Sequence, residues 1–498
     1  MTTPASLWSA AQAAAADAHT MDTLGMPSPV LMERAALCVA AEVVTRCAGL
    51  PVVCLVGPGN NGADALAVAR IVAARGLQAH AWLVTPHRNP AGEAQLALAR
   101  VHGVEVHSSS AALPSEAVWV DGLLGTGSSG PPRGPVSDAL QWVGPQRGPT
   151  IAIDTPSGVE VDTGGVPGVA FRADVTVTLV RSKPGLHITP GRDHAGAVVI
   201  ADIGICADPA GGSPVGLMLT AAAVARALEG MPRSAAHKGH RGHVAVVGGS
   251  PQTPGAAILC GVAAMRIGAG LCTLVGTAVP ESRPELMRAP VGMPVVPGAS
   301  VLAVGPGLTV TPAGIDLERL YREDPRAAVW DASALDSVDL TAAPAGPRIL
   351  TPHPGEAARI LSRRDPEQTW TSARVQENRV AAVNALQSAT GVVVVLKGAG
   401  TLIQDEQGLS VALEGSQALA TAGSGDVLAG CVAGLLAQGL APLEAARVGV
   451  SVHGRAGDVA AAQTGNPLAL EIAQALPHAA RVLCSAAPGP REPRCVVG

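Results

Sequence analysis

The sequence predicts an α/β protein of two domains, and three observations support this prediction. Short apolar runs that end in turn residues alternate with helical patterns along the chain, as is typical of mainly parallel sheets with helices on both faces. A Pro- and Gly-rich stretch at residues 207–222 interrupts this alternation. The chain has 498 residues, whereas single cores rarely exceed about 250–300 residues. We expect domains at residues 1–215 and 225–485.

The first half contains apolar runs that are expected to form buried strands. Residues 51–56 form one such run, and a helical pattern over residues 63–76 follows it and ends at a glycine. The other predicted strands, each with turn residues at its end, occupy residues 78–84, 117–125, 150–158 and 173–180. Ligands bind at the carboxyl ends of strands in such sheets, so the loops after these strands form the candidate site.

A second alternating series follows the predicted boundary. Its strands and the turns after them occupy residues 242–250, 270–276, 301–307, 327–333, 348–356 and 391–401, followed by a glycine-rich helix start at 420–430. The tail SAAPGPREPRCVVG is expected to be disordered because of its Pro and Gly content.

Composition excludes several classes of function. The net charge of −5 gives no basic field for nucleic acid or membranes, and 2% aromatic residues argue against base stacking. The nine cysteines form no metal-binding spacing and are expected to be reduced core thiols. The N-terminal segment lacks the basic start of a secretory signal, and no steadily apolar stretch of about 20 residues occurs. We therefore expect a cytoplasmic protein.

The sequence GPGNNG at residues 57–62 matches the GxGxxG pattern between a strand and a helix. A dinucleotide-binding site also needs an acidic residue about 20 positions later, but none occurs between Asp64 and Glu93. A turn that needs glycine only for steric reasons is one alternative. Another is a pyrophosphate cradle, because Asn60, Asn61 and the loop amides lie at a helix N-terminus.

Polar side chains follow three predicted strands of the first half. Asn61, Asp121 and Ser157 offer oxygen atoms with one carboxylate, a set that suits a weakly held monovalent or hard cation. Asp154 ends another strand at the same rim, where it could be a general acid or base or only a turn cap.

These motifs resemble those of NAD(P)H-hydrate epimerases, in the same order over most of residues 1–205. The resemblance rests on GPGNNGADALAVAR, DGLLGTGSSGPPRGPVS, IDTPSGVEVDTG and KPGLHITPG. It implies a Rossmann-like three-layer αβα domain that inverts C6 of the hydrated nicotinamide in NADHX or NADPHX. It also implies K⁺ at Asn61, Asp121 and Ser157, with Asp154 as the catalytic acid or base. The residues it assigns to substrate binding are Asn60, Asn61, Gly62, Ala63, Asp64, Gly125, Thr126, Gly127, Ser128, Ser129, Gly130, Pro131 and Asp154.

Two positions depart from that family. Ala63 stands where the family has a second glycine, and Glu160 stands where it usually has aspartate. The first change adds a methyl group near the loop, and the second lengthens an acidic side chain by one methylene. Either change could weaken epimerase activity.

In the second half, the stretch ATAGSGDVLAG places Asp426 at the start of an apolar helix. A flexible glycine loop and a helix N-terminus together suit a transferring phosphoryl group. The carboxylate could take a proton from a hydroxyl group, or it could be only a helix N-cap.

This stretch resembles the GxGD signature of ribokinase-like kinases, and the other motifs narrow the resemblance to ADP/ATP-dependent NAD(P)H-hydrate dehydratases over about residues 235–460. Those motifs are HKGHRGHVAVVGGSPQTPGAAILCGVAAMRIGAGLCTLV, VGPGL, WDASALD, LTPHPGEAARIL and VLKGAGTLI. The resemblance implies a ribokinase-like αβα domain, ADP as co-substrate, Mg²⁺ that Glu356 helps to hold, and Asp426 as catalytic base. Its implied substrate contacts are Ala256, Gly307, His353 and Asp426, and its implied nucleotide contacts are Lys397, Gly398, Ala399, Gly400, Thr401 and Gly425. A tyrosine usual in the family is absent from SPQTPGAA, and DASALD replaces its usual DADALN.

Three hypotheses follow. The first is a bifunctional repair enzyme that epimerises the hydrate and dehydrates its S form, acting on small molecules as a homo-oligomer. The second is a small-molecule kinase of the hydroxyethylthiazole or pyridoxal type with a non-catalytic N-terminal half. The third keeps the dehydratase but makes the N-terminal half an interaction module.

Overall fold

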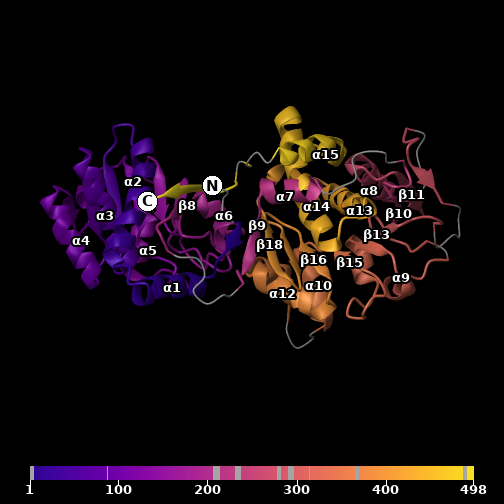
Figure 1. Ribbon diagram of the computed structural model, residues 1–498, viewed down its shortest axis with the longest axis horizontal. Coiled ribbons are helices and arrows are strands. Elements are labelled where there is room, and N and C mark those ends of the chain that lie inside the picture. The colour runs from indigo at the N-terminus through magenta and orange to yellow at the C-terminus, as the bar shows by residue number, and fades with distance from the viewer. Residues whose placement is uncertain are drawn as a thin grey trace. The chain divides into compact units, whose positions relative to one another are not determined.

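A computed structural model describes the chain except residues 1–4, 87, 206–212, 230–236, 277–281, 290–295, 313, 365–368, 486–488 and 490. The chain divides into two compact units, one formed by Met1–Leu217 with Arg491–Gly498 and the other by Met218–Pro490 (Figure 1). Both are α/β units built on largely parallel sheets, so the predicted fold class is confirmed. Residues 207–212 of the predicted linker lie outside the described residues.

The first unit is built on a parallel sheet with the strand order β19-β8-β7-β6-β5-β2-β3-β4. Its central strands are mostly apolar because both faces are covered. The strands are β2 (Val52–Val56), β3 (Ala79–Leu83), β4 (Glu105–His107), β5 (Val118–Gly122), β6 (Thr150–Ile153), β7 (Val175–Leu179), β8 (Ala197–Asp202) and β19 (Arg494–Val497).

Alternate residues of β2 enter two different cores, which shows that helices cover both faces of this sheet. Val52 and Cys54 pack against α2 (Ser28–Arg46), α3 (Asn60–Ala74) and α4 (Pro90–Val101). Val53 and Leu55 pack in the core that contains α5 (Gly134–Val143). The predicted three-layer αβα arrangement is therefore present. A short helix, α1 (Ala10–Ala18), precedes α2 and is capped by Ser9.

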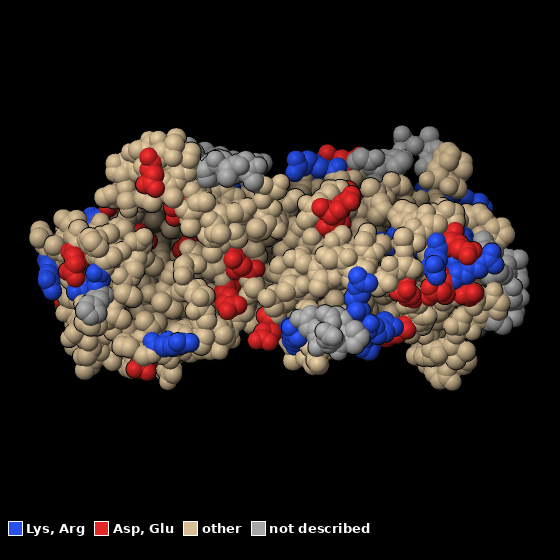
Figure 2. Space-filling model, turned by 90° about the horizontal axis from the view of Figure 1, so that it is seen from below, with Lys and Arg blue, Asp and Glu red and all other residues tan. Residues whose placement is uncertain are grey.

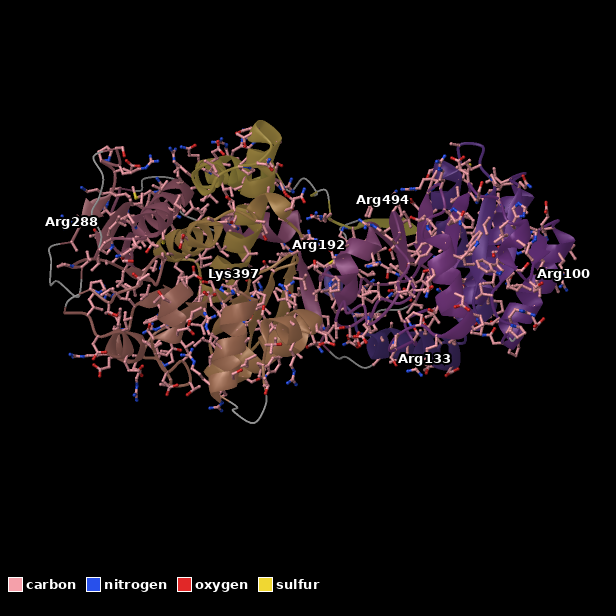
Figure 3. All side chains as sticks on the ribbon, turned by 180° about the vertical axis from the view of Figure 1, so that it is seen from behind. Arg100, Arg133, Arg192, Arg288, Lys397 and Arg494 are labelled. Atoms are coloured by element: carbon pink, nitrogen blue, oxygen red, sulfur yellow. The ribbon has the colours of Figure 1, made fainter. Side chains whose placement is uncertain are left out.

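The prediction of a disordered tail is wrong for its last residues. Strand β19 pairs in parallel with β8, with Arg494 opposite Val199 and Val497 opposite Asp202. Arg494 also forms an ion pair of 2.5 Å with the buried Glu42 of α2 (Figure 3). The C-terminal strand thus completes the edge of the first unit's sheet.

The second unit has a sheet with the order β9-β18-β17-β16-β15-β14-β13-β10-β11-β12. The strands from β16 to β12 run parallel, whereas β17 and β18 are antiparallel. They are β9 (Gly216–Leu219), β10 (His243–Val247), β11 (Leu271–Val275), β12 (Met287–Arg288), β13 (Val301–Val304), β14 (Ala327–Trp330), β15 (Arg348–Leu350), β16 (Val393–Leu396), β17 (Leu402–Asp405) and β18 (Gly408–Ala412).

Helices cover both faces of this second sheet (Figure 1). Five of them share the largest core of the unit, namely α7 (Ala221–Glu229), α8 (Pro254–Ile267), α13 (Ser424–Ala437), α14 (Pro442–Thr464) and α15 (Ala469–Cys484). The other face carries α9 (Leu317–Glu323), α10 (Pro354–Arg364), α11 (Ser372–Glu377) and α12 (Arg379–Thr390). On that face Tyr321 of α9 packs edge-on against the buried Trp330 of β14.

Among the described residues, no helix has both the length and the apolarity needed to cross a membrane. The eight cysteines that the structure describes are free thiols, and six of them are buried, as predicted. On the face shown in Figure 2, Lys and Arg side chains lie in small groups beside Asp and Glu.

Candidate functional sites

The first candidate site lies where the strands of the first unit end. Because the carboxyl ends of parallel strands meet at one edge, residues after β2, β5, β6 and β7 come together there. Asn61 lies in the first turn of α3 after β2, Asp121 lies near the end of β5, and Asp154 directly follows β6. Lys183 follows β7 and is buried. Sequence reasoning singled out the first three of these residues but not Lys183.

Asp121 and Ser157 form a buried, hydrogen-bonded cluster. Asn61 is joined to this cluster through the Leu124 carbonyl, which accepts hydrogen bonds from the side chains of both Asn61 and Ser157. The Asp121 carboxylate accepts hydrogen bonds of 2.7 Å from both the amide and the hydroxyl of Ser157, and one of 3.1 Å from the Leu123 amide. The Leu124 carbonyl accepts from the Asn61 side-chain amide at 2.8 Å. Burial raises the pKa of Asp121 to about 6, although these hydrogen bonds lower it, and no cationic side chain among the described residues offsets the burial. A buried carboxylate among hydroxyl and carbonyl oxygens fits a bound cation.

Asp154 and Lys183 form a buried ion pair. The Asp154 carboxylate also accepts from the Leu179 amide at 3.0 Å, and Lys183 Nζ donates to Thr178 Oγ1 and to the Leu179 carbonyl at 2.9 Å. Asp154 has a φ of 63°, in the left-handed region that residues other than glycine seldom adopt. The alternative of a turn cap does not account for the buried lysine.

Two further carboxyl groups share the electrostatic environment of Asp154. Burial first and the Asp154 charge second raise the pKa of Asp17 to about 6, while Lys183 lowers it. Burial, then Asp154 and Asp17, raise the pKa of Asp64 well above its ordinary value. Asp17 comes from α1 and was missed as a site residue, although it is the one charged residue in the helix sequence AAQAAAADA.

Two of the three glycines of the GPGNNG turn, Gly57 and Gly62, are required by close packing. A Cβ at Gly57 would lie 1.9 Å from the Leu123 carbonyl oxygen, and one at Gly62 would lie 2.0 Å from the Gly57 oxygen. Ala63 is fully buried in the core, so its extra methyl group does not enter the loop. In the second loop, the Gly125 carbonyl accepts from the Ser128 hydroxyl at 2.8 Å.

The second departure from the family, Glu160, folds back onto its own turn. Its carboxylate accepts a hydrogen bond of 2.8 Å from the Thr163 hydroxyl, and its amide donates to the Gly165 carbonyl. The additional methylene is therefore accommodated within the loop of residues 160–165.

The second candidate site lies at the carboxyl edge of the second sheet. Four successive parallel strands from β13 to β16 each contribute a residue from the loop that follows, namely Gly307, Asp331, His353 and Lys397. The first turn of α13 adds Asp426.

Lys397, which is labelled in Figure 3, forms ion pairs with two carboxylates of this site. Its Nζ lies 2.7 Å from Asp331 Oδ1 and 3.7 Å from Glu356 Oε2. Burial lowers the pKa of Lys397, but Asp331, Glu356 and Asp426 raise it by more, so the ammonium group is held charged. Asp331 also accepts a 2.7 Å hydrogen bond from the Thr351 hydroxyl. Asp331 was missed as a site residue, although an aspartate that directly follows a buried strand could have indicated it.

Asp426 is half-buried at the N-terminus of α13. Burial first and the Asp331 charge second raise its pKa to about 7, while Lys397 lowers it. Gly423 precedes the helix with a φ of 88°, and a Cβ at Gly425 would lie 3.5 Å from Lys397 Nζ. The glycines thus leave room beside the carboxylate and the ammonium group.

The remaining predicted substrate contacts lie in two places at this edge. Gly307 has a φ of 65°, and a Cβ there would lie 2.8 Å from that of Ala256. Thr253 and Ser250 donate their hydroxyls to the Gly307 carbonyl at 2.8 and 2.6 Å. His353 is half exposed, and its Nε2 lies 3.4 Å from Glu356 Oε1.

The predicted nucleotide loop, residues 397–401, is held from beneath by Arg379. This buried side chain donates four hydrogen bonds of 2.6–3.3 Å to the backbone carbonyls of Leu396, Lys397, Ala399 and Gly400. A Cβ at Gly398, where φ is 146°, would lie 2.8 Å from the same guanidinium group. Because the carbonyls of the loop point toward the Arg379 guanidinium, this hydrogen bonding favours a loop conformation in which the backbone amides point away from Arg379. Arg379 was missed because it lies in a helix distant in sequence.

Two parallel α/β units, each with a lysine–carboxylate pair beside glycine-rich loops, define a two-domain enzyme of the nucleotide-processing type. Comparison with known proteins agrees with this class. Residues 28–185 match the YjeF-related protein N-terminus family, and residues 244–478 match the NAD(P)H-hydrate dehydratase family.

Full-length relatives match most of the chain. The bifunctional NAD(P)H-hydrate repair enzyme Nnr of Moorella thermoacetica is 34% identical, over 92% of this chain and 93% of that protein. Its Escherichia coli K12 counterpart is 33% identical, over 93% and 91%. A solved ADP/ATP-dependent NAD(P)H-hydrate dehydratase from Bacillus subtilis is 27% identical and covers 53% of this chain and 98% of its own, with a TM-score of 0.47. The chain belongs to the family of bifunctional NAD(P)H-hydrate repair enzymes.

Proposed function

We propose that the two units catalyse consecutive steps of nicotinamide nucleotide repair. The first unit interconverts the R and S forms of NADHX or NADPHX at C6, and the second dehydrates the S form while ADP is converted to AMP and phosphate. The observation that carries the proposal is Asp426, a carboxylate with a pKa raised to about 7 beside Lys397 at a helix N-terminus. Such a group can accept a proton at neutral pH next to an anion site.

In the first unit, the geometry supports acid–base assistance at C6. The charged Lys183 stabilises the Asp154 carboxylate, which can activate water or a hydroxyl group at the ring. Burial, then Asp154 and Asp17, raise the pKa of Asp64 well above its ordinary value, which favours its proton-donating form. A carboxylate paired with a cation and a nearby buried carboxyl group together suit opening of the C6–O bond and re-addition of water on the other face. The glycine-rich loops at residues 57–62 and 125–131 are the proposed phosphate contacts.

In the second unit, Asp426 takes the proton from the C6 hydroxyl as that oxygen attacks the terminal phosphoryl group of ADP. Lys397 and the amides of residues 398–401 orient the phosphates, and positioning with charge neutralisation supplies most of the acceleration. The ring nitrogen lone pair then expels phosphate to give an iminium ion at C6, and loss of a proton from C5 to water restores the C5=C6 double bond. Ala256, Gly307 and His353 are the proposed contacts to the hydrated nucleotide.

Two ions belong to this proposal, and the donor sets present fit them. Asp121 with Ser157 and Asn61 would hold K⁺, which supplies a positive charge near the substrate pyrophosphate. The two carboxylates paired with Lys397 are oxygen ligands of the kind that Mg²⁺ prefers. Glu356 and Asp331 would hold Mg²⁺, which neutralises phosphate charge when bound.

The proposal is tested by the absorbance of regenerated NADH in a mixture of R and S hydrate with ADP. Wild-type protein should consume both forms. Asp426→Asn should abolish recovery, whereas Asp154→Asn should stop it at the S fraction, apart from slow spontaneous epimerisation.

For each of the two proposed activities, one result of this assay would contradict the proposal. Full recovery by Asp426→Asn would refute the role of this base. Recovery by Asp154→Asn at the wild-type rate would refute the role of Asp154. If wild type also recovers the R fraction only at the spontaneous rate, the first unit is not a catalyst. Mass spectrometry of the reaction products tests the kinase alternative. Accumulation of a phosphorylated nucleotide instead of NADH would indicate that the protein is a kinase.

A further inference from the structure

The edge of the first unit's sheet carries a group of metal-binding side chains that the proposed reactions do not use. In the parallel register of β3 and β4, His80 lies opposite Glu105 and Trp82 lies opposite His107. Because side chains alternate along a strand, His80, Glu105 and His107 share one face of the sheet. His80 is buried, His107 is half-buried and Glu105 is exposed.

The ligand atoms of these residues converge. His80 Nδ1 lies 3.1 Å from His107 Nε2 and 3.6 Å from Glu105 Oε2. Zinc binds histidine nitrogen and carboxylate oxygen at roughly 2.0–2.2 Å in a tetrahedral arrangement, so its ligand atoms lie roughly 3.3–3.5 Å from one another. The two observed separations bracket that range.

A hydrogen bond between the two imidazoles accounts for only part of this geometry. If His80 Nδ1 carries a hydrogen, His107 Nε2 and Glu105 Oε2 compete to accept it. If His80 Nδ1 is unprotonated, its lone pair lies close to the negatively charged Glu105 carboxylate. A cation among the three atoms satisfies all of their lone pairs.

We propose that His80, Glu105 and His107 form a zinc site that ties the edge strand β4 to β3. Two nitrogen ligands with one carboxylate select zinc-like ions over Ca²⁺ or Mg²⁺, which prefer oxygen ligands. The exposed side of Glu105 leaves the fourth position to water. His80 lies three residues before the end of β3, about 10 Å along the strand from the catalytic edge. The ion therefore has a structural role, since β4 has only three residues to hold it in the sheet.

The test uses the full-length protein, stripped with a chelator and titrated with Zn²⁺ against a chromophoric chelator. His107→Ala should bind one zinc fewer per chain than wild type. Glu105→Gln, at an exposed position that folding tolerates, should bind more than about tenfold more weakly, the range that loss of even an outer-shell partner produces. The matched control is His102→Ala, because that exposed histidine bonds to Leu98 within its own helix and should leave the titration unchanged.

Two further readouts separate a site from adventitious binding. Zn²⁺ should raise the melting temperature of the first unit in wild type and His102→Ala but not in His107→Ala. Co²⁺ in place of Zn²⁺ should give the intense visible bands of tetrahedral coordination. Equal zinc stoichiometry and affinity in wild type, His107→Ala and Glu105→Gln would overturn the proposal, as would an octahedral Co²⁺ spectrum. Both hydrate activities should persist without zinc, so failure here is distinguishable from failure of the proposed function.

Discussion

Replacing Asp331 by asparagine should move the pH dependence of the dehydratase to lower pH. Burial and the charge of Asp331 raise the pKa of Asp426, while Lys397 lowers it. The substitution removes the like charge and also frees Lys397 from its 2.7 Å ion pair. Both effects favour the ionised form of Asp426, so its pKa should fall, although burial still holds it above the ordinary range.

The expected size of the change follows from the pKa. With a pKa of about 7, roughly one tenth of Asp426 is ionised at pH 6. Charges within a few ångströms shift a pKa by about 1–3 units, so a shift of at least about one unit is expected. At pH 6 the ionised fraction would then be about one half, and the pH-dependent factor in kcat/KM would rise about fivefold. The maximal rate can fall because Lys397 is less well placed, so the midpoint is the quantity to measure.

The assay is kcat/KM for pure S hydrate between pH 5 and 9, which reports the free enzyme. Phosphate groups of the substrate titrate near pH 6, but identically for every variant. Asp336→Asn is the matched control, because it removes an aspartate that pairs with Arg359 at the surface instead. An Asp331→Asn midpoint that stays with the control, or rises, would refute the electrostatic account of Asp426.

Four other outcomes are expected. Asp426→Asn should stabilise the second unit, measured by urea unfolding, by up to about 4 kcal/mol at pH 8 but not at all near pH 3. The reason is that the pKa of Asp426 is higher in the folded state than in the unfolded state, so its ionisation opposes folding as the pH rises from about 4 to 7. Lys183→Met should abolish epimerisation and destabilise the first unit by about 3–5 kcal/mol. Arg379→Met should raise the KM for ADP at least about tenfold, more than it lowers kcat. Deleting residues 491–498 should lower the stability of the first unit by about 2–4 kcal/mol, at about 1 kcal/mol per lost strand hydrogen bond.

Controls for these outcomes come from the division of the chain. Dehydration of pure S hydrate should not change with Lys183→Met or the deletion, and a loss there would contradict the assignment of these residues to the first unit. Arg379→Lys should recover part of the affinity for ADP; equal losses in kcat and KM with both substitutions would indicate general unfolding. A stability gain of Asp426→Asn that persists at pH 3 would show that ionisation is not its cause.

The parts of the sites that sequence could predict lie directly after apolar strands. Asp121, Asp154 and Lys397 were recognisable because a polar residue interrupts a buried run, and parallel strands bring such positions to one edge. The α/β class followed from the same alternation. Local pattern and topology were sufficient for these residues.

The remaining site residues depend on contacts between distant segments. Asp17 lies in an alanine-rich helix, and its role appears only when burial and Asp154 raise its pKa. Arg379 looks like an ordinary helix-start arginine until its four carbonyl partners are seen. The tail was misjudged because Pro and Gly dominate residues 488–493, whereas the four residues of β19 are held by an edge strand encoded far earlier. Such pairing has no local signal.

The two units use lysine in different ways, and the difference matches the chemistry proposed for each. In the first, Lys183 is fully buried and forms an ion pair with the proposed base Asp154 itself. In the second, Lys397 is partly exposed and bonded to Asp331, which leaves Asp426 with the raised pKa. Opening the C6–O bond and adding water back on the other face need acid–base assistance at the ring but no transfer of a phosphoryl group. Phosphoryl transfer instead needs a cation that can turn toward an incoming nucleotide while a separate carboxylate keeps its affinity for the proton.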